Sequence, residues 1–308
     1  MEHLPVMLTE ALRELEIRPD GIYLDCTFGR GGHSQGILSR LGESGRLLAL
    51  DCDWSACNSD SARELLKDRR FTLKHSRFSQ LRSIIEDEGW VGSIDGILID
   101  LGVSSPQLDD SERGFSFLRD GPLDMRMDIN AGISAADWLA NIEEKTLINV
   151  LFDYGEERFA RRIARAVTDR RALSAITTTK QLAALIEDAI PVREKHKHPA
   201  TRSFQAIRIE INKELDELKN VLAQSSEILK PGGRLVVISF HSLEDRIVKR
   251  FFRAESGAKY NPGKLPIKEA DIAKGILKTI GKAIKASAEE IDQNARARSA
   301  IMRVTERV

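Results

Sequence analysis

The fold of this chain is decided by one stretch, IYLDCTFGRGGH at residues 22–33, in which a short apolar run breaks into glycines. Residues 34–41 follow with apolar side chains at helical spacing. The pattern therefore predicts a strand, a glycine turn and a helix in succession. Doubly wound α/β sheets present backbone to a nucleotide-like ligand at such a turn, where glycines permit close approach and a positive φ.

Two features of the turn indicate its ligand. The dinucleotide fingerprint G-x-G-x-x-G would need glycine or alanine at position 34, where this chain has Ser34. Asp25 stands four residues before Gly29 and gives D-x-x-x-G-x-G-G, the first motif of methyltransferases that use S-adenosylmethionine (SAM). An acid at this strand end suits a ligand with an α-amino group and a sulfonium, and no pyrophosphate to repel it. A glycine turn without a ligand is the alternative.

Composition limits the class of protein. The 308 residues suffice for one large or two modest domains. Lysine plus arginine equals aspartate plus glutamate, at 47 each, so a nucleic-acid partner would need local basic patches. Cys26, Cys52 and Cys57 lack metal or CxxC spacing and fit a reducing cytosol. No apolar run approaches the roughly 20 residues of a membrane span and no signal peptide is evident, so we expect a cytoplasmic protein.

Two further strands are expected to end beside the glycine turn. The apolar run at 46–51 ends in Asp51, where a doubly wound sheet places the acid that accepts hydrogen bonds from both ribose hydroxyls. An ordinary strand-end aspartate is the alternative. Phe78 follows a third strand at 71–75. Its ring could pack against adenine or belong to the core.

The next strand, at 94–100, ends in Asp100 and leads into a Ser104-Ser105-Pro106-Gln107 loop, the expected reaction site. Methylation of a pyrimidine carbon usually needs a cysteine, and this loop has none. An exocyclic amine instead needs acceptors for its N–H groups, which a serine- and proline-containing loop can supply. The alternative is a common Ser-Pro turn.

The pattern changes after this loop. Residues 108–200 show helical periodicity without a convincing strand. One long helix is expected next, with apolar residues at helical spacing over 204–222 and a stop at 230–233. A fifth strand at 234–240 and a final strand at 297–304 complete the sheet, whereas 259–285 is lysine-rich and unassigned. We therefore predict a discontinuous sheet domain at 1–107 and 204–308, interrupted by an all-helical substrate-recognition domain at 108–203.

Other side chains could serve the reaction. His241, after the fifth strand, could contact substrate or act as a base, or be structural. Asp124 and Arg126 could form a self-contained ion-pair loop or a lid. Basic patches at 158–171, 195–198 and 246–253 suit phosphate contacts but could be solvated faces. No histidine has a partner at metal spacing, so we predict no catalytic metal. The candidates to take a proton from the amine are Asp100, Ser105, Asp124, His241 and Glu244.

Taken together, these strings resemble the ribosomal small-subunit methyltransferase H family, also called MraW. The resemblance covers nearly the whole chain in order. The matching segments are residues 3–8, 27–34, 95–107, 113–117, 121–128, 154–157, 198–202, 239–246 and 296–299.

The resemblance implies a Rossmann-like SAM-dependent methyltransferase sheet with an inserted helical domain. It implies N4-methylation of a cytidine in the decoding centre (P site) of 16S ribosomal RNA, within the small ribosomal subunit. It leaves a homodimer open. The implied SAM contacts are Gly31, Gly32, His33, Asp51, Phe78, Asp100 and Gln107. The candidates for catalysis or substrate positioning are Asp100, Ser105, Asp124 and His241.

The chain departs from the family pattern at four places: Cys52-Asp53-Trp54, Ser76-Arg77, Ser203 and Asn294-Ala295. The first two flank the expected adenosine pocket, so the affinity for the cofactor could differ. Two other functions remain open at this point. A nicotinamide-dependent oxidoreductase would use a similar sheet, but the missing third glycine argues against it. An RNA-binding assembly factor would carry a vestigial pocket, but no degraded motif supports this.

Overall fold

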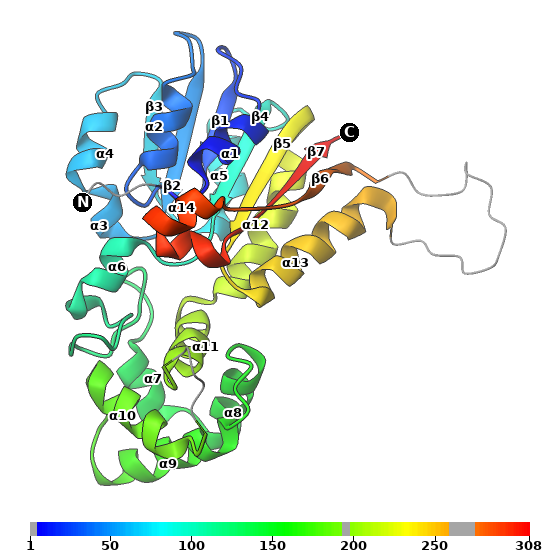
Figure 1. Cartoon of the computed structure of the whole chain (residues 1–308). Coiled ribbons are helices and arrows are strands. Elements are labelled where there is room, and N and C mark those ends of the chain that lie inside the picture. Colours follow the sequence, from blue (N-terminus) through cyan, green and yellow to red (C-terminus); the bar gives the residue numbers. More distant parts are fainter. Residues whose placement is uncertain (1–4, 193–197, 259–274) are drawn as a thin grey trace, which may run out of the picture. The chain divides into compact units, whose positions relative to one another are not determined.

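The structure is a computed structural model that describes residues 5–192, 198–258 and 275–308 (Figure 1). Residues 195–197 of the predicted basic patch at 195–198 and most of the unassigned lysine-rich segment lie outside the described residues. The chain divides into two compact units. Unit 1 comprises Met1–Gly102 and Leu215–Val308, and unit 2 comprises Val103–Glu214.

Unit 1 is built on a seven-stranded sheet of order β3-β2-β1-β4-β5-β7-β6. The strands are β1 (Ile22–Asp25), β2 (Arg46–Asp51), β3 (Phe71–His75), β4 (Ile94–Asp100), β5 (Leu229–Ser239), β6 (Leu277–Lys285) and β7 (Ile301–Arg307). Strands β1 to β5 are parallel, while β7 runs antiparallel to both β5 and β6. The strand order reverses between β1 and β4, where open α/β sheets bind their ligands. The predicted doubly wound α/β class is confirmed.

Helices cover both faces of this sheet. Consecutive residues of β1, Tyr23 and Leu24, belong to two different apolar clusters, as expected of a strand buried on both sides. Helices α1 and α2 pack on the Tyr23 side, and α5, α12 and α13 pack on the Leu24 side. The helices of unit 1 are α1 (Leu8–Glu14), α2 (Gly32–Leu38), α3 (Trp54–Cys57), α4 (Asp60–Leu65), α5 (Leu81–Asp87), α12 (Glu214–Ile228), α13 (Ser242–Arg253) and α14 (Ala288–Gln293).

Unit 2 is helical. Its helices are α6 (Ser105–Asp109), α7 (Ala135–Asn141), α8 (Glu144–Asp153), α9 (Ala160–Leu173), α10 (Thr179–Ala189) and α11 (Thr201–Asn212). Apart from one isolated bridge between Pro122 and Thr178, the described part of this unit pairs no strands. The unit is larger than the predicted insertion at 108–203 because Phe204 and Ile207 of α11 belong to its apolar core.

The prediction of one continuous helix from residue 204 to a stop at 230–233 is wrong. The segment is two helices, α11 and α12, separated at Lys213, whose backbone is left-handed with φ +54°. The side chain of Asn212 turns into unit 2, where its Nδ2 donates to the Met125 carbonyl and its Oδ1 accepts from the Met127 N–H. The apolar spacing continues across this break, so periodicity alone conceals it.

The C-terminal strands also differ from the prediction. Residues 295–299 form a 3₁₀ turn, and the last strand, β7, begins at Ile301. The edge strand β6 was not predicted, because its lysines and Gly281 interrupt the alternation of apolar and polar residues that is typical of a strand. Charged residues are typical of the exposed edges of sheets. Among the described residues, no helix combines the length and the apolarity needed to traverse a bilayer.

The left-handed backbone at Lys213 predicts which of two substitutions, Lys213→Gly or Lys213→Ala, gives the more stable protein. Both Lys213→Gly and Lys213→Ala remove the ion pair with Glu210, so their difference isolates the backbone. In a left-handed position glycine should be more stable than alanine by about 1 kcal/mol, whereas inside a continuous helix it should be less stable by about the same amount. Urea unfolding of the two variants measures this difference. A more stable alanine variant would show that the helix is continuous.

Candidate active site

The carboxylate of Asp25, at the end of β1, is completely buried and organises the glycine turn. Its Oδ1 accepts from the N–H of Thr27 at 3.1 Å and from the Thr27 hydroxyl at 3.4 Å. Its Oδ2 accepts from the hydroxyl of Ser34, on α2, at 2.7 Å. These hydrogen bonds hold the strand, the turn and the helix together, and the suitability of Asp25 for a ligand with an α-amino group stays a prediction.

The glycine turn needs glycine for two reasons. Gly29 and Gly31 have φ of +54° and +77°, as predicted from the motif. A Cβ on Gly31 would also approach the Phe28 ring to 2.9 Å, and one on Gly32 would collide with Pro5. The turn is thus fixed both by its backbone conformation and by what packs against it.

Asp51, at the end of β2, faces the glycine turn. Its Oδ2 accepts from the N–H of Gly29 at 2.7 Å, and its Oδ1 accepts from the N–H of Asp53 at 2.8 Å. Burial raises the pKa of Asp51 to about 6, although these two N–H groups lower it. Each carboxylate oxygen can accept a further hydrogen bond. The group can therefore bind a pair of hydroxyls without giving up its present contacts.

His33, which is buried, and Asp100, which is half-buried, lie next to each other at the point where the strand order reverses. The N–H of Asp100 donates to the Thr27 hydroxyl at 2.8 Å, so Asp100 is tied to the same turn. Its Oδ2 lies 3.7 Å from Nδ1 of His33, and its Oδ1 has no hydrogen-bond partner among the described residues. His33 Nε2 bonds the Val6 carbonyl at 3.1 Å, and a carbonyl only accepts, so Nε2 carries the proton.

The electrostatics of this pair favour a positively charged ligand. Burial raises the pKa of Asp100 well above its usual range, and the charges of Asp25 and Glu244 raise it further. Burial lowers the pKa of His33, partly opposed by Asp25. A half-buried carboxyl that lies near two other acids and has one unpaired oxygen gains most from a cation or a strong donor.

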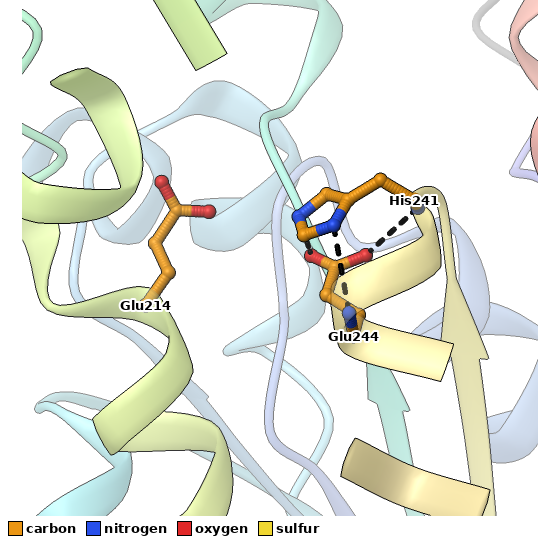
Figure 2. A group of neighbouring side chains, drawn as sticks. All are labelled: Glu214, His241 and Glu244. Carbon is orange, nitrogen blue, oxygen red and sulfur yellow. Dashed lines mark hydrogen bonds and ion pairs between the residues drawn. The ribbon is translucent and has the colours of Figure 1, made fainter. Parts of the chain in front are cut away.

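His241 is bonded within its own helix terminus (Figure 2). It precedes α13, and Glu244 accepts from the N–H of Phe240 at 2.8 Å and from the N–H of His241 at 3.2 Å. The Nε2 of His241 lies 3.1 Å from Glu244 Oε1. This is a helix-capping arrangement, which favours the structural interpretation of His241. Glu214, also drawn, is bound by Arg208 at 2.8 Å within unit 2.

Phe78 begins a 3₁₀ turn after β3 and is half-buried against the apolar cluster on the Leu24 side of the sheet. The neighbouring Ser76 donates to Gln80 Oε1 at 2.7 Å. This packing gives Phe78 a core contact. Its predicted contact with adenine stays a prediction.

The remaining predicted residues belong to unit 2. Ser104 to Gln107 is the first turn of α6 rather than a loop, and Gln107 Oε1 accepts from the Ser104 N–H at 2.9 Å. Ser105 is buried, and its hydroxyl has no hydrogen-bond partner among the described residues.

Arg126 binds Asp124 with two hydrogen bonds, of 2.7 and 2.8 Å. Burial raises the pKa of Asp124, but these bonds outweigh burial and hold it below its usual value. Asp124 is therefore in an ion pair rather than poised as a base.

The structure brings His33, Asp51 and Asp100 to one edge of the sheet, through groups that the sequence did not single out. These groups are the hydroxyls of Thr27 and Ser34 and the carbonyl of Val6. The hydroxyls stand beside the D-x-x-x-G-x-G-G motif and could have been noticed. No sequence signal marks the carbonyl, since every residue has one.

Comparison with known proteins gives one consistent result. The model of the MraW methylase family matches residues 1–308. A protein named ribosomal RNA small subunit methyltransferase H from Alteromonas mediterranea is 54% identical over 308 residues, covering 100% of this chain and 98% of its own. Proteins of the same name from Hydrogenovibrio crunogenus and Thiobacillus denitrificans are 54% and 56% identical, each over 306 residues, covering 99% of this chain and 96% and 97% of their own.

The raised pKa of Asp51 predicts a pH-dependent stability. An unfolded aspartate titrates near pH 4 and the folded one near 6, so between these values the folded state holds the extra proton. The ligand-free protein should therefore lose about 2 kcal/mol of stability, relative to Asp51→Asn, as pH rises from 4.5 to 7. Urea unfolding of both proteins at several pH values measures this. A difference that stays constant with pH would contradict the burial of this carboxylate.

Proposed function

The chain belongs to the MraW methylase family, and from this premise we propose that it transfers a methyl group from SAM to the N4 amine of a cytidine in 16S ribosomal RNA. The proposed target lies in the decoding centre, at the P site of the small ribosomal subunit. The family resemblance found in the sequence is confirmed by the match over residues 1–308. The proposed target follows from that resemblance and from the name of the relatives.

One observation carries the assignment of SAM. The parallel strands β1, β2 and β4 end side by side, and Asp51 and Asp100 at two of these ends keep open acceptor positions around the glycine turn. Asp51 fits the two hydroxyls of a ribose, and Asp100 fits the cationic amino-acid end of the same ligand. Gly29 to Gly31 would allow the ligand to approach the backbone.

When bound, SAM supplies a methyl carbon made electrophilic by the attached sulfonium. The protein has to align the amine of the substrate with that carbon and keep water out. We assign Ser105 as the acceptor for the N–H of the substrate amine, because its buried hydroxyl lacks a partner among the described residues. Asp124 is less suited to take the amine proton, because Arg126 stabilises its charged form.

The exposed face of α13 supports a polyanionic substrate. Arg246, Lys249, Arg250 and Arg253 are exposed and stand at positions i, i+3, i+4 and i+7, which lie on one face of a helix. The acids of the helix lie elsewhere, since Glu244 is buried and Asp245 pairs with Arg303 of β7. We assign this α13 stripe to RNA phosphates.

The helical unit, at residues 103–214, is the proposed substrate-recognition domain. A nicotinamide cofactor is disfavoured, because position 34 requires the hydroxyl that binds Asp25 rather than a third glycine. A ribosomal substrate would place the protein in the cytoplasm. Homodimer formation remains a prediction.

Nucleoside analysis tests the proposed reaction. Small-subunit ribosomal RNA from a deletion strain should lack one N4-methylated cytidine, and the wild-type chain should restore it. Asp51→Ala should not restore it, because the site loses the acceptor that holds the glycine turn and the proposed ribose. Asp60→Ala, at an exposed position on α4, serves as the control and should restore the modification. Mass spectrometry that finds the modified nucleoside intact in the deletion strain would remove the proposed substrate.

Salt dependence tests the α13 stripe. Replacing Lys249, Arg250 and Arg253 with serine should raise the KM for the ribosomal substrate roughly tenfold and lower the slope of log affinity against log salt by up to about 2. The affinity for SAM should not change. Arg63, Lys67 and Arg69, replaced together, give the same change in net charge and should have little effect. An unchanged salt slope in the α13 variant would contradict the assignment.

A further inference from the structure

The first described residues of the chain cross the glycine turn. Gly32 packs so closely on Pro5 that a Cβ on Gly32 would collide with the proline ring. The next carbonyl along the chain, that of Val6, accepts the hydrogen bond from Nε2 of His33. The segment before α1 therefore holds the start of α2 and fixes the ring of His33.

Met7 makes the turn from this segment into α1. Its φ is +54°, a left-handed conformation that costs free energy in any residue other than glycine. No side chain of its own caps α1, and Met7 is fully buried. Its N–H donates instead to Oε1 of Glu290 at 2.6 Å, so a residue 283 positions later fixes this turn.

Glu290 is held in place to make that contact. It lies on α14, whose N-cap is Ser287, and its own N–H donates to the Ser287 hydroxyl at 3.1 Å. The neighbouring Ile291 packs on the apolar cluster that contains Val6 and Met7. Glu290 is half-buried, whereas Glu289 is exposed. Among the described residues, Glu290 contacts the N-terminal segment and the adjacent Glu289 does not.

We propose that Glu290 is a positioning residue of the cofactor site, although no contact links it directly to His33 or Asp100. It fixes the backbone of Met7 and thereby aims the Val6 carbonyl at His33. His33 in turn lies 3.7 Å from Asp100, the strand-end acid with an open oxygen. The C-terminal helix α14 thus sets the affinity for the cofactor. This inference rests on the proposed function, because it assumes that SAM binds at Asp51 and Asp100.

Three substitutions of Glu290 distinguish the effect of the length of its side chain from the effect of its charge. Glu290→Gln keeps an acceptor oxygen at the same reach and loses the charge. Glu290→Asp keeps the charge but is one methylene too short, and Glu290→Ala removes the group. Glu289→Ala is the matched control on the same turn of α14.

Calorimetry with S-adenosylhomocysteine, the product form of the cofactor, gives the dissociation constants. We expect the Ala and Asp variants at position 290 to bind about five- to twentyfold more weakly than wild type. Glu290→Gln and Glu289→Ala should stay within about twofold. In steady-state assays the KM for SAM should rise in the weak binders while kcat at saturating SAM stays near wild type. General destabilisation would not produce this split or the rescue by glutamine.

The outcomes distinguish this inference from the function on which it rests. If wild type binds the product and all three position-290 variants match it, the positioning role is overturned and the proposed cofactor stands. If Glu290→Gln is as weak as Glu290→Asp, the reach of the acceptor is not the determinant, and the role is overturned as well. If wild type does not bind S-adenosylhomocysteine, the proposed function fails and takes this inference with it.

Discussion

The site depends on one buried carboxylate. Asp25 ends β1 inside the protein and accepts hydrogen bonds from Thr27 and Ser34, so it fixes the glycine turn to the strand before it and to α2 after it. The Thr27 hydroxyl in turn accepts a hydrogen bond from the N–H of Asp100, at the end of the neighbouring β4. A charge without water needs such bonds, because an unpaired buried carboxylate is strongly unfavourable. The positions of the turn and of two strand ends follow from satisfying this single group.

Several acidic side chains lie close together at the same edge of the sheet, and their charges repel one another. Burial raises the pKa of both Asp51 and Asp100, and each is raised further by neighbouring acids. This arrangement destabilises the protein without its ligand and favours whatever brings donors and positive charge. A cofactor with two ribose hydroxyls, an ammonium and a sulfonium offers both. Family membership and the local electrostatics thus point to the same kind of ligand by independent arguments.

The sequence predicted most of the sheet because parallel strands buried on both faces are continuous apolar runs, as at 46–51 and 94–100. It failed where a pattern was compatible with two structures. The apolar spacing across Lys213 fits one helix or two, and only the contacts of Asn212 decide between them. Ser104 to Gln107 has the composition of a turn and of a helix start, and it is a helix start. Asp25 was identified correctly as part of the motif, but its burial depends on Ser34 and Thr27 folding over it.

The most direct test is a crystal structure of the protein with S-adenosylhomocysteine. The account predicts the ribose hydroxyls within hydrogen-bond distance of Asp51, the amino-acid end at Asp100, and Asp25 still bonded to Thr27 and Ser34. Density for the ligand away from the ends of β1, β2 and β4, or a ligand that touches neither Asp51 nor Asp100, would contradict it.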